Sequence, residues 1–291
     1  MIIIATLIWG SGYVAQSAGM YYVAPLTFNA VRFAIGGTIA LGPTLFFVLR
    51  QRSMQIKADQ PISISKSTVF SGIVCGIVLC LAINLQQFGI LFTSVANASF
   101  ITSLYVIMVP IVSLIFIKKK ASVFVWVSVA VAMVGMYFLS LSGGFYINLG
   151  DILVFLCALA FTIQILLISH FSPKHNVIVL ACVQFYVVSI LSLILAIIFE
   201  VPSITAILAA APYVLYTGVL SSGVAYILQM KAQKTTDATI AAVLFSFEGV
   251  VAAIVGWVVL AQFLTPRELV GCVLILIAIL VAQYPVKEKQ Q

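Results

Sequence analysis

A carboxylic acid lies near the middle of an apolar segment that is long enough to cross a bilayer. Residues 244–264 read LFSFEGVVAAIVGWVVLAQFL, and Glu248 is the acid. An ionisable group at membrane depth is costly, so it is expected to have a partner, a cavity or a function. Removal from water favours the neutral carboxyl. Glu248 is therefore predicted either to exchange protons or bind a substrate amine, or to brace its helix as a protonated or Arg-paired acid.

Arg32 is a second charged group inside an apolar segment, with Asn29 one turn before it on the same helix face. A guanidinium carries a planar fork of donors that suits a carboxylate, so Arg32 can be interpreted as a clamp for a substrate carboxylate. The alternative is a structural arginine that extends toward the membrane surface or binds backbone carbonyls.

Polar and aromatic side chains recur at helical spacing in four other apolar segments, where residues three, four or seven positions apart share one helix face. The candidate substrate-binding residues chosen in this way are Trp9, Tyr13, Gln16, Asn84, Gln87, Gln164, Tyr226 and Gln229, with Cys80, Phe161 and Ser222 as their neighbours on the same faces. We expect these faces to converge on a central cavity that hydrogen-bonds a polar substrate and stacks its apolar part. The alternative for any single residue is a hydrogen bond that joins two helices.

The sequence has none of the patterns that enzymes use. It contains no nucleophile–base constellation, no metal-ligand cluster and no G-x-x-x-x-G-K-[ST] loop for nucleotide phosphates. The two histidines, His170 and His175, flank Lys174 in one short loop and are expected to be solvated. All five cysteines lie inside apolar runs, where a small buried side chain is the expected role. We therefore predict a protein that binds and moves a ligand, with no enzymatic activity, cofactor or metal ion.

Membrane-spanning helices must position these residues. Of the 291 residues, 64% are hydrophobic and 7% are charged, and the mean hydropathy is +1.25, whereas soluble domains have about 25% charged residues. The net charge of +7 does not indicate nucleic acid binding, because the basic residues fall between apolar runs instead of forming one patch. The chain begins with the apolar run Met1 to Ile8, so we expect a retained first helix instead of a cleaved signal peptide.

Apolar runs of about 20 residues predict an all-α integral membrane protein. The ten expected transmembrane helices are 2–20, 26–49, 69–92, 95–117, 122–141, 149–169, 177–199, 206–230, 237–261 and 267–285, and five prolines (Pro25, Pro173, Pro202, Pro212, Pro266) lie at or near their starts. Proline costs least at such positions. Pro110 lies inside the fourth span and predicts either a kink there or compensation by neighbouring groups. Residues 50–66 and Gly143-Gly144 are expected to be loops, and Gly72 and Gly76 predict a close helix approach.

The distribution of lysine and arginine predicts the orientation. With the N-terminus inside, the outer loops contain only Arg267, whereas the inner loops contain Arg50, Arg52, Lys57, Lys66, Lys118, Lys119, Lys120, Lys174, Lys231, Lys234, Lys287 and Lys289. Arg32 lies within a span and is not counted. Because cytoplasmic loops are enriched in positive charge, both termini are expected inside.

The two halves of the chain show a weak internal repeat. Residues 93–99 (TSVANAS) open the fourth span in the same style as residues 234–239 (KTTDAT) open the ninth, and Gln16 and Gln164 each lie nine residues before a proline. The period is five helices, and because five is odd the halves must have opposite topology. We therefore predict two inverted five-helix repeats, 1–142 and 143–291, with a site near the midplane between them.

Several stretches resemble EamA-type members of the drug/metabolite transporter superfamily. LIWGSGYVA at 7–15 is similar to the start of the family's first helix. The family's second-half pattern, E-P-x-x-A-x-x-x-G-W followed by L-G-E, L-T and a glycine, resembles Phe247-Glu248, Ala252-Ala253, Gly256-Trp257, Leu264-Thr265 and Leu269-Val270-Gly271. Gly249 stands where the family usually has proline, and Ala261-Gln262 stands where it has Gly-Glu. Relatives often carry arginine at the position of Arg32 whatever their substrate, which favours a structural role for that residue.

The resemblance implies a membrane carrier of small organic metabolites, often amino acids, and frequently an exporter. We expect a monomeric permease in the lipid bilayer of the inner (cytoplasmic) membrane, which moves a small-molecule substrate by alternating access, with Glu248 as the candidate for exchanging protons. The odd number of helices per half removes any need for a dimer. Two alternatives stay open, namely an uptake or exchange carrier for another metabolite class and a non-transport intramembrane assembly protein.

Overall fold

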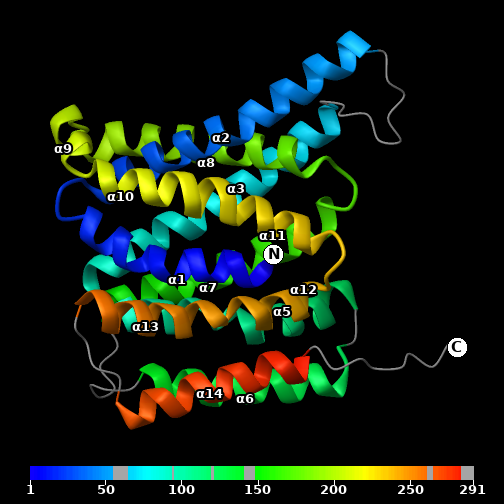
Figure 1. Ribbon diagram of the computed structural model, residues 1–291, viewed down its shortest axis with the longest axis vertical. Helices are drawn as coiled ribbons and strands as arrows, with labels where there is room; N and C mark the ends of the chain where they lie inside the picture. Colours follow the sequence, from blue (N-terminus) through cyan, green and yellow to red (C-terminus); the bar gives the residue numbers. More distant parts are fainter. Residues whose placement is uncertain (55–64, 94, 119–120, 141–147, 261–264, 283–291) are drawn as a thin grey trace, which may run out of the picture.

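The computed structural model describes residues 1–54, 65–93, 95–118, 121–140, 148–260 and 265–282. Within these ranges the chain consists of helices and short turns, with no strand. Figure 1 shows the helices lying across the long axis of the molecule, with α6 (Val123–Ser140) and α14 (Pro266–Ala282) at one end and α2 (Pro25–Met54) and α8 (Val177–Phe199) toward the other. The helices that lie between these two pairs hold the site together with α2.

Each of the ten expected spans coincides with one helix or with consecutive helices. The remaining elements are α1 (Ile2–Gly19), α3 (Lys66–Phe92), α4 (Val95–Thr102), α5 (Tyr105–Val112), η1 (Ser113–Ile117), α7 (Leu149–Phe171), α9 (Ile204–Ala209), α10 (Ala211–Tyr216), η2 (Thr217–Ala225), α11 (Tyr226–Gln233), α12 (Ala238–Phe245) and α13 (Phe247–Leu260). Seven helical segments in the described part are long and apolar enough to cross a membrane, and two apolar stretches in α6 and α14 are shorter. The all-helical architecture is confirmed for the described residues, and the count of ten spans stays a prediction.

Proline marks several helix starts as expected. Pro25 and Pro266 are the first residues of α2 and α14, and Pro212 lies in the first turn of α10. The loop predicted for 50–66 begins later than expected, because α2 continues to Met54. The predicted Gly143-Gly144 loop lies outside the described residues.

The fourth and ninth spans are each interrupted near their middle. α4 ends at Thr102 before α5 begins at Tyr105, and α12 ends at Phe245 before α13 begins at Phe247. Bonds from residue i+3 to residue i tighten both interruptions: Leu104 N donates to Ile101 O, and Gly249 N donates to Ser246 O. Such tight turns inside helices often mark functional regions.

Pro110 is not where the fourth span is interrupted. It lies inside α5, and the π-helical turn η1 follows it. Because proline has no N–H to donate, the chain after Pro110 changes its hydrogen-bonding pattern without ending the helix there. The helix continues through Pro110, and the interruption of this span lies at Ser103 and Leu104 instead.

Gly72 and Gly76 allow α3 to pack closely on α8, as their spacing predicts. A Cβ atom on Gly72 would lie 2.7 Å from Val183 Cβ, and one on Gly76 would lie 2.7 Å from Val187 Cβ. A Cβ atom at either position would force the two helices to shift apart, so both glycines favour this close approach. This contact places α3, which carries part of the site, against the second half of the chain.

A half-buried carboxylate fixes the start of α2, the helix that carries Arg32. Glu200, at the end of α8, accepts bonds at 2.8 Å from Leu26 N and Thr27 N and at 2.7 Å from the Thr27 hydroxyl. An acid is favourable there because a helix N-terminus has free N–H groups and a partial positive charge. Glu200 thus ties the entry of α2 to α8.

His175 is not the solvated residue that the sequence predicted. Its Nδ1 is 3.1 Å from the Thr68 hydroxyl and its Nε2 is 3.1 Å from the Ser71 hydroxyl, so its ring links the α7–α8 turn to the start of α3. Partial burial and the neighbouring Lys174 ammonium hold the pKa of His175 below its ordinary value. His170 is exposed, as expected, with Nε2 2.7 Å from Lys174 Nζ.

Candidate functional site

The predicted face of the first helix lines an internal cavity. Trp9, Tyr13 and Gln16 all lie on its wall. The indole N–H of Trp9 donates to Ser221 O at 3.4 Å, and its ring packs against Tyr226 and Phe245 with centroids 5.0 and 5.6 Å apart. The spacing of these residues on α1 therefore produces the arrangement that the sequence predicted.

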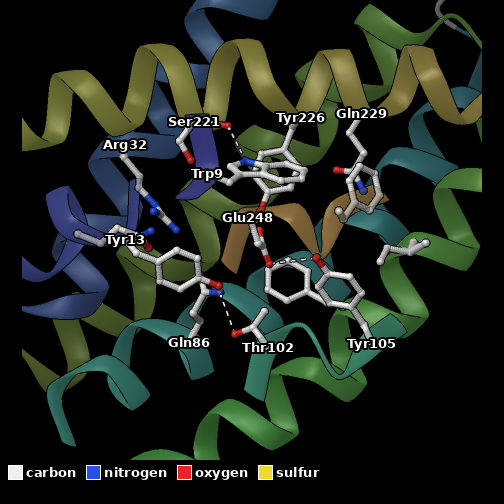
Figure 2. A pocket seen from close by; sticks show the side chains of 14 residues that line it. Trp9, Tyr13, Arg32, Gln86, Thr102, Tyr105, Ser221, Tyr226, Gln229 and Glu248 are labelled. Atoms are coloured by element: carbon white, nitrogen blue, oxygen red, sulfur yellow. Dashed lines mark hydrogen bonds between the residues drawn. The ribbon is translucent and has the colours of Figure 1, made fainter. Parts of the chain in front are cut away.

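The cavity contains about 500 Å³ of space not occupied by protein atoms, part of it open to the surroundings. Figure 2 shows the side chains that surround it, which come from α1, α2, α3, α4, α5, α7, α11, α12, α13 and η2. The wall consists of Trp9, Tyr13, Gln16, Arg32, Gln86, Thr102, Tyr105, Phe161, Ile165, Ser221, Tyr226, Gln229, Phe245 and Glu248. Six of these residues are aromatic, so the cavity combines large apolar faces with a few polar groups.

Glu248 enters this cavity just after the interruption of the ninth span. It is 5% exposed, and its Oε1 accepts a hydrogen bond from the Tyr105 hydroxyl at 3.0 Å (Figure 2). Gly10 lets α1 approach closely, because a Cβ there would lie 2.7 Å from Glu248 O and 2.5 Å from Val251 Cβ. The described residues place no basic group in an ion pair with Glu248, so the Arg-paired interpretation has no support there.

Arg32 enters the same cavity from α2 and is 3% exposed. Its guanidinium carbon lies 5.1 Å from the centre of the Phe33 ring and 5.7 Å from that of Phe28. Its Nε has no hydrogen-bond partner, and no acid in the described part of the chain lies within ion-pair distance. The cation is therefore held by aromatic rings and keeps its donors directed at the cavity.

The cavity thus has two separate charge-bearing groups on its wall. A buried charge without a partner is costly, so a ligand that supplies the missing partner is stabilised by the site. Arg32 can accept an anionic group through its fork of donors, and Glu248 can accept a cationic or donor group. Between them the aromatic rings can stack on an apolar or cationic part of the ligand.

Three predicted residues lie outside this wall. Asn84 accepts a bond from Asn29 Nδ2 at 2.8 Å and donates to the Ser192 hydroxyl at 3.0 Å, so it joins α2, α3 and α8. Gln87 is fully buried and neither of its side-chain polar atoms has a partner. Gln164 lies behind the wall, where its Oε1 accepts a bond from Gln229 Nε2 at 3.3 Å. For Asn84 the interhelical alternative describes the observed contacts.

Sequence reasoning missed seven residues of the wall. They are Gln86, Thr102, Tyr105, Phe161, Ile165, Ser221 and Phe245, of which only Phe161 had been noted, as a neighbour of Gln164. Gln86 rather than Gln87 faces the site, and its Nε2 donates to the Tyr13 hydroxyl at 3.0 Å. Ser221 rather than Ser222 faces it, because Ser222 packs against Gly36 of α2. Tyr105 and Phe245 flank the two helix interruptions, which the structure reveals and which have no strong local signal in the sequence.

A metal site has no support in the described residues. No group of three or more His, Cys, Asp or Glu side chains comes together there, and all five cysteines are buried.

Comparison with known proteins identifies the family. The sequence profile of the EamA-like transporter family matches residues 1–141 and 148–284. The chain belongs to the EamA-like transporter family. It is therefore a multi-span membrane protein and a membrane transporter, and the family that residues 7–15 and 247–271 resemble is confirmed.

Relatives of this EamA-like transporter carry names that agree with the family. An "uncharacterized transporter" of Archaeoglobus fulgidus is 35% identical over 287 residues, covering 96% of this chain and 83% of the relative. The "uncharacterized transporter YoaV" of Bacillus subtilis is 25% identical over 94% of this chain and 92% of the relative. A protein of known crystal structure shares the fold, with a TM-score of 0.73, 18% identity and coverage of 96% of both chains.

Proposed function

We propose that this EamA-like transporter is a secondary carrier that exports amino acids or closely related metabolites across the cytoplasmic membrane by alternating access. The observation that carries the proposal is that Arg32 and Glu248 line one cavity and form no ion pair with each other. A zwitterionic amino acid carries the complementary pair of groups. Its carboxylate suits the guanidinium of Arg32, and its ammonium suits the carboxylate of Glu248.

The aromatic wall supports an amino acid with an apolar or aromatic side chain. Trp9, Tyr226 and Phe245 form a continuous group of rings beside the cavity. Such rings stack on flat or apolar groups. Tyr13, Gln16 and Gln229 add hydrogen-bonding groups to the proposed binding set.

Ten spans in two inverted repeats, 1–142 and 143–291, with both termini inside, form the proposed architecture. The two segments that match the family profile have nearly these bounds. The packing supports the same relationship. When each span is replaced by the span five positions away in the chain, pairs of spans that pack together become pairs that also pack together. α2 packs on α8 and α6 packs on α14, while the α3–α7 contact corresponds to that of α1 with α10, η2 and α11.

A ligand-dependent melt of the detergent-solubilised protein tests the substrate class. Three series are compared, namely free amino acids, their amides without the carboxylate and their N-acetyl derivatives without the ammonium. We expect the melting temperature to rise only with the free amino acids, because only they satisfy both charged groups. The absence of any shift, or equal shifts from all three series, contradicts the proposed substrate class.

Direction and coupling require flux measurements. Inside-out vesicles should accumulate a labelled amino acid that raises the melting temperature, whereas right-side-out vesicles should not. Repeating the assay with and without a pH gradient shows whether protons are coupled, with Glu248 as the proposed site. Accumulation in right-side-out vesicles alone supports the uptake alternative.

The cytoplasmic membrane and a monomeric state complete the proposal. Light scattering of the purified protein in detergent should give the mass of one chain after subtraction of the micelle. A mass of two chains contradicts the monomer.

A further inference from the structure

A second cavity lies beside the central one along the contact between α7 and α11. It contains about 910 Å³ of space not occupied by protein atoms, part of it open to the surroundings. Its wall includes Ser169 and His170 of α7, Gln233 at the end of α11 and the α11–α12 turn with Lys234. In the proposed topology this turn and the α7–α8 turn face the cytoplasm, so the second cavity is an inner vestibule.

One helical turn separates the two cavities on both helices. Ile165 and Gln229 line the central cavity, whereas Ser169 and Gln233, each four residues further along, line the vestibule. Four residues of α-helix span about 6 Å. The partition between the cavities is therefore a single layer of side chains.

Gln233 closes this layer. It is 2% exposed, and its Nε2 donates to Ile165 O at 3.1 Å and to the Ser169 hydroxyl at 3.0 Å. One turn deeper, Gln229 Nε2 donates to Gln164 Oε1 at 3.3 Å. Two glutamines of α11 thus reach across to α7, one at the floor of each cavity.

These contacts are inexpensive to break. All are neutral hydrogen bonds, and the loss of one interhelical bond of this kind changes an equilibrium only about threefold on average in a measured membrane protein. The side-chain oxygens of Gln229 and Gln233 have no partner, so part of the hydrogen-bonding capacity of each residue is unused in this arrangement. A contact of this strength suits an element that must open and close.

We propose that Gln233, held by Ile165 O and the Ser169 hydroxyl, is the inner gate between the central cavity and the vestibule. The gate rests on the proposed function, because only a transported ligand requires a passage. When the two bonds break and the Gln233 side chain leaves the partition, the cavities join into one path from Glu248 to the α11–α12 turn. Gln229 belongs to both the binding wall and the layer above the gate, so a ligand that engages it contacts the gate region directly.

Cysteine labelling from the inner side tests the gate without requiring transport. Ser221→Cys places a thiol on the wall of the central cavity, and inside-out vesicles are treated with a charged methanethiosulfonate reagent that does not cross the bilayer. Protein with only its five buried native cysteines supplies the background. Gln233→Ala is then combined with Ser221→Cys. We expect labelling about eightfold faster, the population change that corresponds to losing two interhelical hydrogen bonds of average strength.

Two further variants make the result specific. Gln184→Ala removes another fully buried glutamine, on α8 and outside both cavities, and should leave the labelling rate unchanged. Ser169→Ala removes one of the two bonds with little change in volume and should accelerate labelling about threefold. It keeps the test valid if Gln233→Ala does not fold.

The proposal that Gln233 is the gate is contradicted if Gln233→Ala and Ser169→Ala are labelled at the rate of the parent. It is also contradicted if Gln184→Ala accelerates labelling as much as Gln233→Ala does. Failure of the proposed function has a different signature. In that case no amino acid shifts the melting temperature, whereas the labelling rates still respond to position 233.

Discussion

Tyr105 and Glu248 are each the third residue after an eight-residue helix, and they are hydrogen-bonded to each other at 3.0 Å. The helices that precede them, α4 and α12, belong to the two interrupted spans. α5 packs on α12 and α13 packs on α4. The two interruptions therefore meet at one point on the wall of the cavity. A change at either residue reaches both halves of the chain, and this makes the pair the first target for mutation.

Glu248→Gln separates the functional role of the acid from a structural one. Glutamine keeps the side-chain volume and an oxygen that accepts the bond from Tyr105, but it removes the negative charge. We expect the unliganded melting temperature to change little, whereas affinity for a zwitterionic ligand falls about 10- to 100-fold, because a hydrogen bond to a charged group contributes about 1.5–3 kcal/mol. Isothermal titration of both proteins measures this.

Tyr105→Phe is the matched control for Glu248→Gln, since it removes the hydroxyl and leaves the acid. If Glu248→Gln unfolds the protein while Tyr105→Phe does not, the acid has a structural role. If the parent and Glu248→Gln bind the ligand with equal affinity, the Glu248 carboxylate does not take part in binding.

Arg32→Lys tests whether the forked donors matter. Lysine keeps the positive charge, but its compact ammonium cannot make two parallel bonds to a carboxylate and is more strongly hydrated. We expect affinity for the free amino acid to fall about tenfold or more, which equals about 1.4 kcal/mol. Affinity for the corresponding amide, already weak, should change little. A structural arginine predicts the opposite, namely a lower melting temperature with the ligand preference preserved.

Gly10→Ala should disturb the contact of α1 with the helix that carries Glu248. The added Cβ would lie 2.7 Å from Glu248 O and 2.5 Å from Val251 Cβ, so the helices must separate. We expect the free energy of unfolding to fall by about 1–3 kcal/mol, as for other overpacked sites, and ligand binding to weaken. Gly42→Ala is the control, because nothing lies within 4 Å of its Cβ position. Replacing glycine by alanine in an exposed part of a helix should stabilise the folded protein by about 0.5–1 kcal/mol. An equal fall in the free energy of unfolding of both variants would refute the packing argument.

His175 predicts a pH dependence of stability. Burial and Lys174 lower its pKa in the folded protein from the ordinary 6.5. Below pH 6.5 the unfolded chain takes up a proton that the folded chain resists, so stability falls with decreasing pH in this range and is insensitive to His175 above it. Melting curves of the parent and His175→Gln between pH 8 and 5 measure the difference. Parallel pH profiles would show that the contact with Thr68 and Ser71 does not depend on a neutral ring.

Membrane helices and the first-helix face could be predicted because both depend on period and hydropathy. Trp9, Tyr13 and Gln16 lie on one side of an uninterrupted helix, so their spacing translates directly into a common wall. Asn84 follows the same rule, yet its face packs on α8. Periodicity identifies residues that share a face, but not the neighbour that the face meets.

The interruptions limited the prediction elsewhere. Pro110 is the visible helix-breaking residue of the fourth span, but the break occurs at Ser103 and Leu104, which carry no strong local signal. The selection of Tyr105 as a partner of Glu248 requires the distance between two helices that are far apart in sequence. That distance is a property of packing, and a single sequence does not encode it in any local pattern.

The π-helical segment η2 has a consequence for how the eighth span can change. A π-helix takes more residues per turn than an α-helix, so the nine residues of η2 shift the faces of Tyr226 and Gln229 relative to α10. Inserting or deleting a residue within Thr217–Ala225 would change the winding of this segment, and with it the position of Tyr226 and Gln229 relative to α10. In this span the length of the chain, as well as the identity of its residues, sets the shape of the cavity. Insertions or deletions that spare Ser221 therefore offer a route to altered ligand preference without substituting any wall residue.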